Sequence, residues 1–356
     1  MARILYGLCG EGLGHASRSK ILINYLNKHD HEIRIVAGGK SYNFLSKEFD
    51  SLYKIEWPSV IYKNNKVEVL HSALRVFYRT LVSSIKSFFM VRKIIKDFKP
   101  DLLITDAEPI SHYAAFFSQM KRISIDNPHA LLYRKYKVKF GEYLAWFFLT
   151  DAIKVSIFNA DKYIIYDFFD EQIDNKQVLF LKPLIQEGIL KQKPVYGDHI
   201  FVYQTSTSSG FIYDILKKFD EKFIIYGSNK DIVDGNLVFK RFNETDFYHD
   251  ISHAKAVITN GGFTVISEAL YLKKPIFSLP INYQFEQILN GKFVEKLGVG
   301  VYHMNLDEKK LEDFLDNLDQ YKESLKSYNP GKQEETLKII EEEIQKLLPK
   351  QSGSNS

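Results

Sequence analysis

The feature that most constrains this chain is an alternation of short apolar runs with longer helical patterns, which occurs twice along its 356 residues. In the first half we expect strands at residues 3–8, 32–37, 101–105 and 122–125. From residue 186 to 199 the pattern is lost among glycine, proline and polar residues, and it restarts at residue 200. Such alternation is typical of parallel sheets covered by helices. The sequence therefore predicts an α/β protein with two Rossmann-like domains.

The two repeats set the expected domain boundaries. We expect an N-terminal domain over residues 1–189, a C-terminal domain over 198–330, a helix over 331–348 and a flexible polar tail over 349–356. Sheets of this type bind ligands beyond the carboxyl ends of their strands. We therefore expect the binding site in a central cleft where the two domains face each other.

Composition excludes several other classes of protein. Cys9 is the single cysteine, so no internal disulfide can form, and no apolar run approaches the roughly 20 residues of a membrane span. These features predict a cytoplasmic protein. The charge is uneven, because residues 1–150 hold 23 Lys and Arg against 13 Asp and Glu. The N-terminal half is thus expected to meet an anionic partner.

A glycine loop follows the first expected strand, with Gly10, Gly12 and Gly14 leading to His15. Glycines there let the backbone approach a ligand and leave helix amides free for an anion. A histidine at this edge suits a general base if a carboxylate orients its ring. Asp106 ends a neighbouring strand and is the expected partner. The alternatives are a plain turn, a dinucleotide loop, and a capping role for Asp106.

Two further polar side chains are expected at the same edge of the sheet. Glu108 comes two residues after Asp106, and His129 lies in the turn after the fourth strand. We expect both side chains on the side of the cleft that the N-terminal domain forms, where an acceptor substrate would bind. For His129 an ordinary turn is the alternative.

The second half carries a more specific pattern. Gly261 and Gly262 end a strand, and Phe263 and Thr264 begin a helix, which offers free amides and a positive dipole end to a pyrophosphate. Glu268, about one turn further on, is positioned to accept hydrogen bonds from ribose hydroxyls as an ionised carboxylate. Glu286 and Gln287 begin another helix and can sort sugar hydroxyls by hydrogen bonding.

Together these residues resemble the inverting glycosyltransferases of the GT-B fold, in particular the branch with the peptidoglycan N-acetylglucosaminyltransferase and the UDP-glycosyltransferases (glycosyltransferase families 28 and 1). The donor motif of that family appears here as Gly261, Gly262, Thr264, Glu268, Ala269, Pro275, Pro280, Glu286, Gln287, Asn290 and Gly298. The resemblance implies that His15, partnered by Asp106, deprotonates an acceptor hydroxyl. It also implies a UDP-sugar co-substrate and no other cofactor.

The resemblance places the donor more closely. Ser206 and Thr207 would help to hold the pyrophosphate, and the nucleobase would lie near Phe242. Glu286 stands where the family has Asp or Gln, and Lys273-Lys274 replaces a small residue and glycine in what we expect to be a tolerant loop. No Asp-x-Asp motif occurs, so we expect transfer without a metal ion.

Two stretches of the N-terminal half, residues 74–99 and 131–148, interleave basic and aromatic side chains. A membrane surface near a lipid-linked or glycolipid acceptor is one explanation, and ordinary amphipathic packing is another. We expect no nucleic acid, because no motif for it accompanies the pattern. The function predicted is an inverting, metal-independent glycosyltransferase, which the membrane-surface explanation would attach peripherally to the inner face of a membrane. A nucleotide-sugar epimerase and a non-catalytic binding protein are the alternatives.

Overall fold

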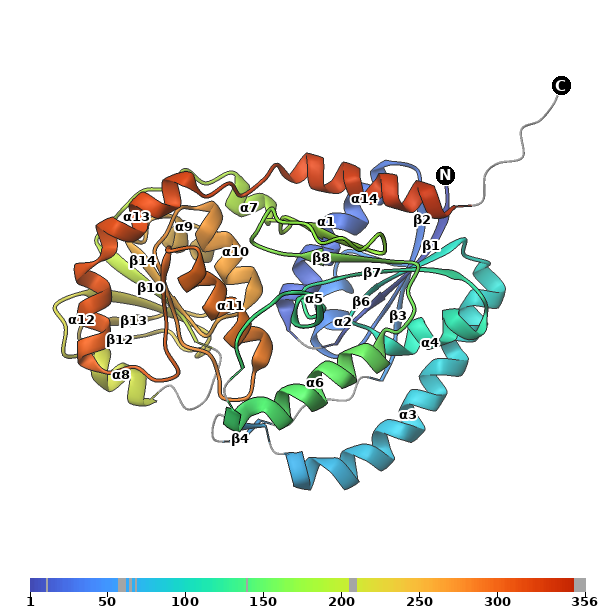
Figure 1. The fold of residues 1–356 in the computed structure, drawn as a ribbon, viewed down its shortest axis with the longest axis horizontal. Coiled ribbons are helices and arrows are strands. Elements are labelled where there is room, and N and C mark those ends of the chain that lie inside the picture. The colour runs from blue at the N-terminus through green and yellow to red at the C-terminus, as the bar shows by residue number, and fades with distance from the viewer. Residues whose placement is uncertain are drawn as a thin grey trace.

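A computed structural model describes residues 1–10, 12–56, 62–63, 66–67, 69–138, 140–204 and 210–348. Our predictions for Ser206, Thr207 and the tail at 349–356 therefore lie outside the described residues. Two seven-stranded sheets form the molecule, one in each half of the chain. They lie side by side, each with helices around it (Figure 1).

The first sheet is parallel throughout, with strands in the order β3-β2-β1-β6-β7-β8-β9. Its strands are β1 (Arg3–Leu8), β2 (Glu32–Ala37), β3 (Leu52–Lys54), β6 (Leu102–Asp106), β7 (Lys121–Asp126), β8 (Lys162–Tyr166) and β9 (Val178–Leu181). Its helices are α1 (Leu13–Lys28), α2 (Gly39–Leu45), α3 (Val69–Phe98), α4 (Pro109–Phe117), α5 (Ala130–Tyr133) and α6 (Tyr143–Ser156). Central strands such as β6 are buried at every residue, as expected for a sheet covered on both faces.

The second sheet has the order β12-β13-β11-β10-β14-β15-β16, and only its edge strand β12 runs antiparallel. Its strands are β10 (His199–Tyr203), β11 (Lys222–Tyr226), β12 (Ile232–Asp234), β13 (Leu237–Phe239), β14 (Ala256–Thr259), β15 (Ile276–Ser278) and β16 (Gly300–Tyr302). Its helices are α7 (Glu187–Leu190), α8 (Gly210–Leu216), α9 (Glu244–Ser252), α10 (Phe263–Tyr271), α11 (Phe285–Lys296), α12 (Glu308–Asp316) and α13 (Leu318–Ser327). The predicted α/β class with two Rossmann-like sheets is confirmed.

Some local predictions differ from the structure. Residues 308–327 form two helices, because the chain breaks at Asn317 between α12 and α13. Helix α1 begins at Leu13, so His15 lies within its first turn. Strands β3, β8, β9, β12 and β16 were not predicted, since short apolar runs beside turns carry little periodicity.

The last helix, α14 (Gln333–Leu347), returns to the first half of the molecule (Figure 1). Ile340 and Ile344 are buried, and two of its carboxylates pair with the first sheet's domain. Glu341 lies 3.0 Å from His31 Nε2, and Glu343 lies 3.2 Å from Lys162 Nζ. The chain therefore crosses between the two halves twice.

The sequence suggested that the lysine pair before Pro275 lies in a tolerant loop, and the structure contradicts this prediction. Lys274 is fully buried and donates to the carbonyl of Val195 in the first crossing at 2.7 Å. Lys273 has a φ of 58° and donates to the carbonyls of Leu325 and Tyr328, just before the second crossing. Lys274 thus binds the first segment that joins the two halves, and Lys273 binds the residues just before the second one.

Candidate active site

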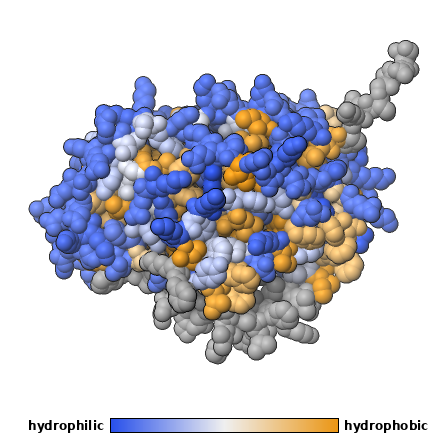
Figure 2. Space-filling view, in the orientation of Figure 1, coloured by the Kyte–Doolittle hydropathy of each residue, from blue (hydrophilic) through white to orange (hydrophobic). Residues whose placement is uncertain are grey.

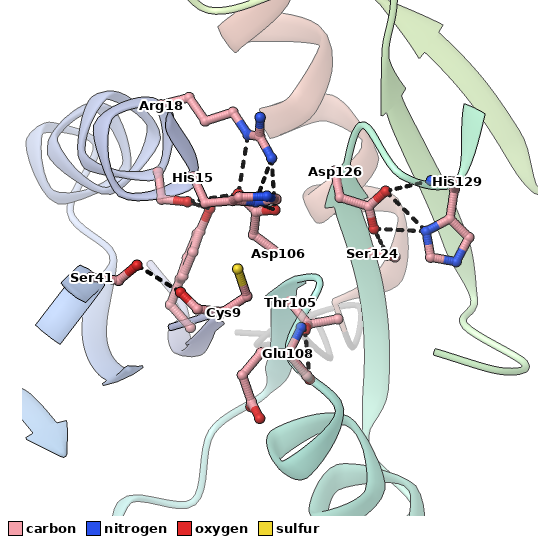
Figure 3. Close-up of polar contacts among 12 residues, drawn as sticks. Cys9, His15, Arg18, Ser41, Thr105, Asp106, Glu108, Ser124, Asp126 and His129 are labelled. Atoms are coloured by element: carbon pink, nitrogen blue, oxygen red, sulfur yellow. Dashed lines mark hydrogen bonds and ion pairs between the residues drawn. The ribbon is translucent and has the colours of Figure 1, made fainter. Parts of the chain in front are cut away.

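The sheet brings His15 and Asp106 together, as predicted. Asp106 is the last residue of β6 and pairs in register with Leu8 at the end of β1, and Cys9 N donates to the Asp106 carbonyl at 3.0 Å. From α1, His15 reaches back over this edge, and its Nδ1 lies 2.7 Å from Asp106 Oδ1 (Figure 3). Asp106 thus occupies the position that orients a histidine base.

Asp106 is surrounded by hydrogen-bond donors. Arg18 donates to Oδ2 from Nε at 3.2 Å and to Oδ1 from Nη2 at 3.0 Å, and the Ser19 hydroxyl donates to Oδ2 at 3.1 Å. Burial alone would raise the pKa of Asp106, but Arg18, His15 and these hydrogen bonds lower it to about 2. The carboxylate is therefore ionised at every pH at which the protein would work.

The charges around His15 oppose one another. Burial and the Arg18 cation lower the pKa of its imidazole, whereas Asp106 and Cys9 raise it, and the net pKa lies well above the ordinary value. The imidazole therefore holds a proton in a larger fraction of molecules than a free histidine does at neutral pH, and more of it becomes available as a base as the pH rises. Glu286 lies in α11, in the second half of the molecule. Burial raises the pKa of its carboxyl, and the positive charges of His15 and Arg18 lower it.

Glu108 and His129 have other tasks in the structure. The Glu108 carboxylate is buried and caps α4, accepting from the amides of Ile110 and Ser111 at 2.7 Å each. His129 is also buried, and its Nδ1 lies 2.7 Å from Asp126 Oδ2, on the far side of Asp126 from His15 (Figure 3). Both side chains are thus buried within the first half, and His129 Nε2 has no hydrogen-bond partner among the described residues.

The donor loop has the backbone form expected of an anion site. Gly261 has a φ of 81°, and a Cβ there would meet the Gln287 carbonyl oxygen at 2.7 Å. Gly262 is the N-cap of α10 and offers no side chain to that helix end. Asn290 donates to the Gly261 carbonyl at 3.0 Å, and the Gln287 amide oxygen accepts from Ile281 N at 3.0 Å. The α11 residues of the motif therefore hold the loop as well as bordering it.

Glu268 is a buried carboxyl for which the described residues supply no hydrogen-bond partner. Burial raises its pKa to about 8, so it is protonated at neutral pH, whereas the sequence argument required an ionised group. Phe242 lies at the end of β13 with half of its surface exposed, where a nucleobase was expected.

Phe263 and Thr264 lie against the first half of the molecule. The Phe263 ring stacks on Phe168, which follows β8, at 4.8 Å between centroids. A Cβ on Gly14 would meet Thr264 Oγ1 at 2.4 Å, so the first turns of α1 and α10 touch. Gly14 is needed for this close approach. The glycine loop and the donor loop, distant in sequence, therefore meet at one place.

Arg18 is the residue of this site that the sequence argument missed. It lies three residues after His15, so helical geometry brings it to the same face of α1. Arginine one turn after a candidate base was a signal in the sequence, but its partner Asp106 is 88 residues away.

No three His, Cys, Asp or Glu side chains in the described part of the chain are grouped as ligands for a metal ion. No helix in the described ranges is long and apolar enough to cross a bilayer.

Two Rossmann-like sheets whose glycine loops meet beside a histidine–carboxylate pair define a glycosyltransferase of the GT-B type. The model of the family described as Glycosyl transferase family 1 matches residues 2–319, and the chain belongs to this family. The predicted family resemblance is confirmed at this level.

Similar proteins agree with this assignment. An uncharacterized glycosyltransferase of Methanosarcina mazei is 27% identical over 333 residues, with 84% of each chain covered. The solved structure of the glycotransferase of kitacinnamycin matches with a TM-score of 0.68 and 15% identity, covering 98% of this chain and 99% of that one. MurG of Acinetobacter baumannii matches with a TM-score of 0.63 and 13% identity over 97% of this chain and 100% of its own. At such identities the two structures establish the fold.

Proposed function

We propose that this glycosyltransferase moves a sugar from a nucleotide-diphosphate donor to a hydroxyl of a lipid-linked or glycolipid acceptor. The preferred donor is a UDP-sugar, and the transfer inverts the configuration at the anomeric carbon. The contact between Nδ1 of His15 and Asp106, beside the donor loop, carries the proposal. With Nδ1–H directed at the carboxylate, the lone pair of Nε2 is available for a proton.

The proposed reaction follows from this arrangement. The acceptor oxygen gives its proton to His15 Nε2 and attacks the anomeric carbon, while the bond from that carbon to the diphosphate oxygen breaks on the opposite face. The departing diphosphate carries the negative charge to the N-terminus of α10 behind Gly262, where free amides and the helix dipole stabilise it. Since the helix end supplies this stabilisation, the proposal requires no metal ion.

Calorimetric titration with UDP, GDP and TDP tests the donor assignment. We expect UDP to bind with micromolar affinity in EDTA, and magnesium to change that affinity by less than about threefold. Assays with UDP-sugars and lipid acceptors then follow the β- or α-configuration of the product. Absence of binding by all three nucleotides contradicts the donor site, and conversion of the sugar nucleotide without any acceptor indicates the epimerase instead.

Glu268 makes UDP binding depend on pH. If ribose hydroxyls bind the ionised carboxylate, binding expels the proton that this group holds below pH 8. Affinity is therefore expected to rise by up to about tenfold per pH unit from pH 6 to 8 and then level off. Calorimetry in two buffers of different ionisation enthalpy measures the proton released. Glu268→Gln should bind more weakly with a flatter profile, and an unchanged slope in this variant contradicts the assignment.

The proposed lipid acceptor is supported by the outer face of α6. Tyr143, Leu144, Phe147, Phe148 and Val155 expose between 49% and 72% of their surface. Figure 2 shows apolar side chains in this region of the first half. Exposed lysines and arginines of α3 belong to the same half, namely Lys86, Arg92, Lys93 and Lys96. An apolar helix face with basic neighbours fits an anionic lipid surface.

Vesicle flotation tests this attachment. We expect the protein to float with vesicles containing about a third phosphatidylglycerol and to remain unbound with phosphatidylcholine alone. Replacing Leu144 and Phe148 by serine should lower the bound fraction at least tenfold, since each contributes about 2 kcal/mol of apolar burial. Val233→Ser, which removes an equally exposed apolar side chain from β12, is the control. Equal flotation of both variants contradicts the α6 surface.

A further inference from the structure

Arg18 is a buried cation that the reaction outlined above does not use. Its side chain is 5% exposed, although arginine is rarely buried without a specific task. Two of its nitrogens bind the two oxygens of Asp106, which is the bidentate geometry that fixes a carboxylate in orientation. Because His15 Nδ1 also contacts Oδ1, the position of the imidazole depends on where Arg18 holds this carboxylate.

The cover over Arg18 comes from both halves of the molecule. Its guanidinium carbon lies 5.7 Å from the centre of the Tyr166 ring in β8 and 5.9 Å from that of Phe263 in α10. Phe263 is held there by its stack on Phe168. If the halves separate, Phe263 leaves with the second half and one side of the guanidinium meets water. The surroundings of Arg18 therefore depend on the contact between the halves.

We propose that Arg18 is a positioning residue, which fixes Asp106 beneath His15 and opposes protonation of the imidazole while Phe263 from the other half covers it. The inference rests on the proposed function of His15. Arg18 Nη2 lies 2.5 Å from His15 Nδ1, so a protonated imidazole places a second cation beside the first. In a largely buried site this repulsion is strong, and it opposes the pull of Asp106.

The other charged groups that face His15 do not replace Arg18. Asp106 from β6 and Cys9 after β1 both favour the protonated ring, and so does Glu286 from α11 across the boundary. Arg18 is thus the group among these four that works against protonation. Without it, His15 would hold its proton to a higher pH and would be a base in a smaller fraction of molecules.

NMR titration of the histidines in the full chain tests the proposed role of Arg18, and it does not require the protein to transfer sugar. The His15 signals are assigned by their loss in His15→Gln. In Arg18→Gln we expect the His15 midpoint to rise by about one pH unit or more. Arg18→Lys keeps the charge, so its midpoint should stay within about half a unit of the wild type, while sugar transfer falls at least tenfold because the two-pronged contact is lost.

The control is Arg34→Gln. Arg34 also packs on two aromatic rings of the first half, Phe98 at 4.5 Å and Tyr53 at 5.9 Å, but it is not among the groups that act on His15. Its loss should leave the His15 midpoint unchanged. Phe263→Ala, which leaves Arg18 in place but uncovers it, should produce part of the upward shift.

Each result with these variants supports or contradicts the proposed role of Arg18. An unchanged midpoint in folded Arg18→Gln overturns the proposal, and an unchanged midpoint in Phe263→Ala overturns the dependence on the second half. If Arg18→Gln does not fold, Arg18→Lys decides, because full activity there excludes a positioning role. If the midpoints move as expected but the wild type transfers no sugar from any donor, the proposed function fails and the role of Arg18 stands.

Discussion

His15→Ala is expected to lower the turnover of sugar transfer by about a thousandfold, within the range that a general base contributes. In the proposed reaction the imidazole takes the acceptor proton, whereas the donor loop around Gly261 does not depend on it. UDP affinity should therefore stay within about twofold of the wild type. Turnover with saturating donor and calorimetry of UDP measure the two quantities separately.

Two further variants make this result specific. Asp106→Asn removes the charge that orients His15 and should also reduce turnover by two to four orders of magnitude. His29→Ala removes an exposed histidine from the end of the same helix α1 and should have no effect. In the wild type, turnover should rise with pH, because the raised pKa of His15 keeps part of the base protonated. A joint loss of turnover and UDP binding in His15→Ala would count against the base assignment.

Gly261→Ala is expected to weaken UDP binding at least tenfold and to lower the free energy of unfolding by about 2–4 kcal/mol. The residue adopts a φ of 81°, and the added methyl would stand 2.7 Å from the Gln287 carbonyl oxygen and 3.2 Å from Ser278 Oγ. The loop must then move away from α11, which takes the amides of α10 out of position. Calorimetry and chemical denaturation measure the two effects.

The matched comparison is Gly235→Ala. Gly235 also has a positive φ, 63°, but a methyl group there meets no atom within 4 Å. This variant carries the backbone strain alone, so we expect a loss of about 1 kcal/mol and an unchanged UDP affinity. If Gly235→Ala and Gly261→Ala bind UDP equally, the geometry of the donor loop is not what holds the nucleotide.

The central pair could be predicted because its geometry follows from topology. Asp106 ends β6 and His15 lies in the first turn of the helix that follows β1, and the carboxyl ends of parallel strands share one edge. The glycine pair of the second half could be predicted for the same reason. What these residues touch was harder to predict, since Glu108, at the same edge as Asp106, caps α4 instead.

The remaining contacts depend on how side chains from distant elements meet. Lysine is nearly always exposed, so no sequence rule predicted that Lys274 would be buried against the first crossing. Phe263, the first residue of α10, stands between Gly262 and Thr264 of the donor motif, yet its ring packs on the other half. A motif gives a residue's place in the chain and not the direction of its side chain.

The return of α14 has a consequence for how the protein is made. Residues 333–347 cover the domain that begins with β1, and among the described residues the carboxylate partners of His31 and Lys162 lie in this helix. On the ribosome, the half that emerges first must therefore wait until the second half has been synthesised before its surface is complete. The domain translated first is the last to be finished.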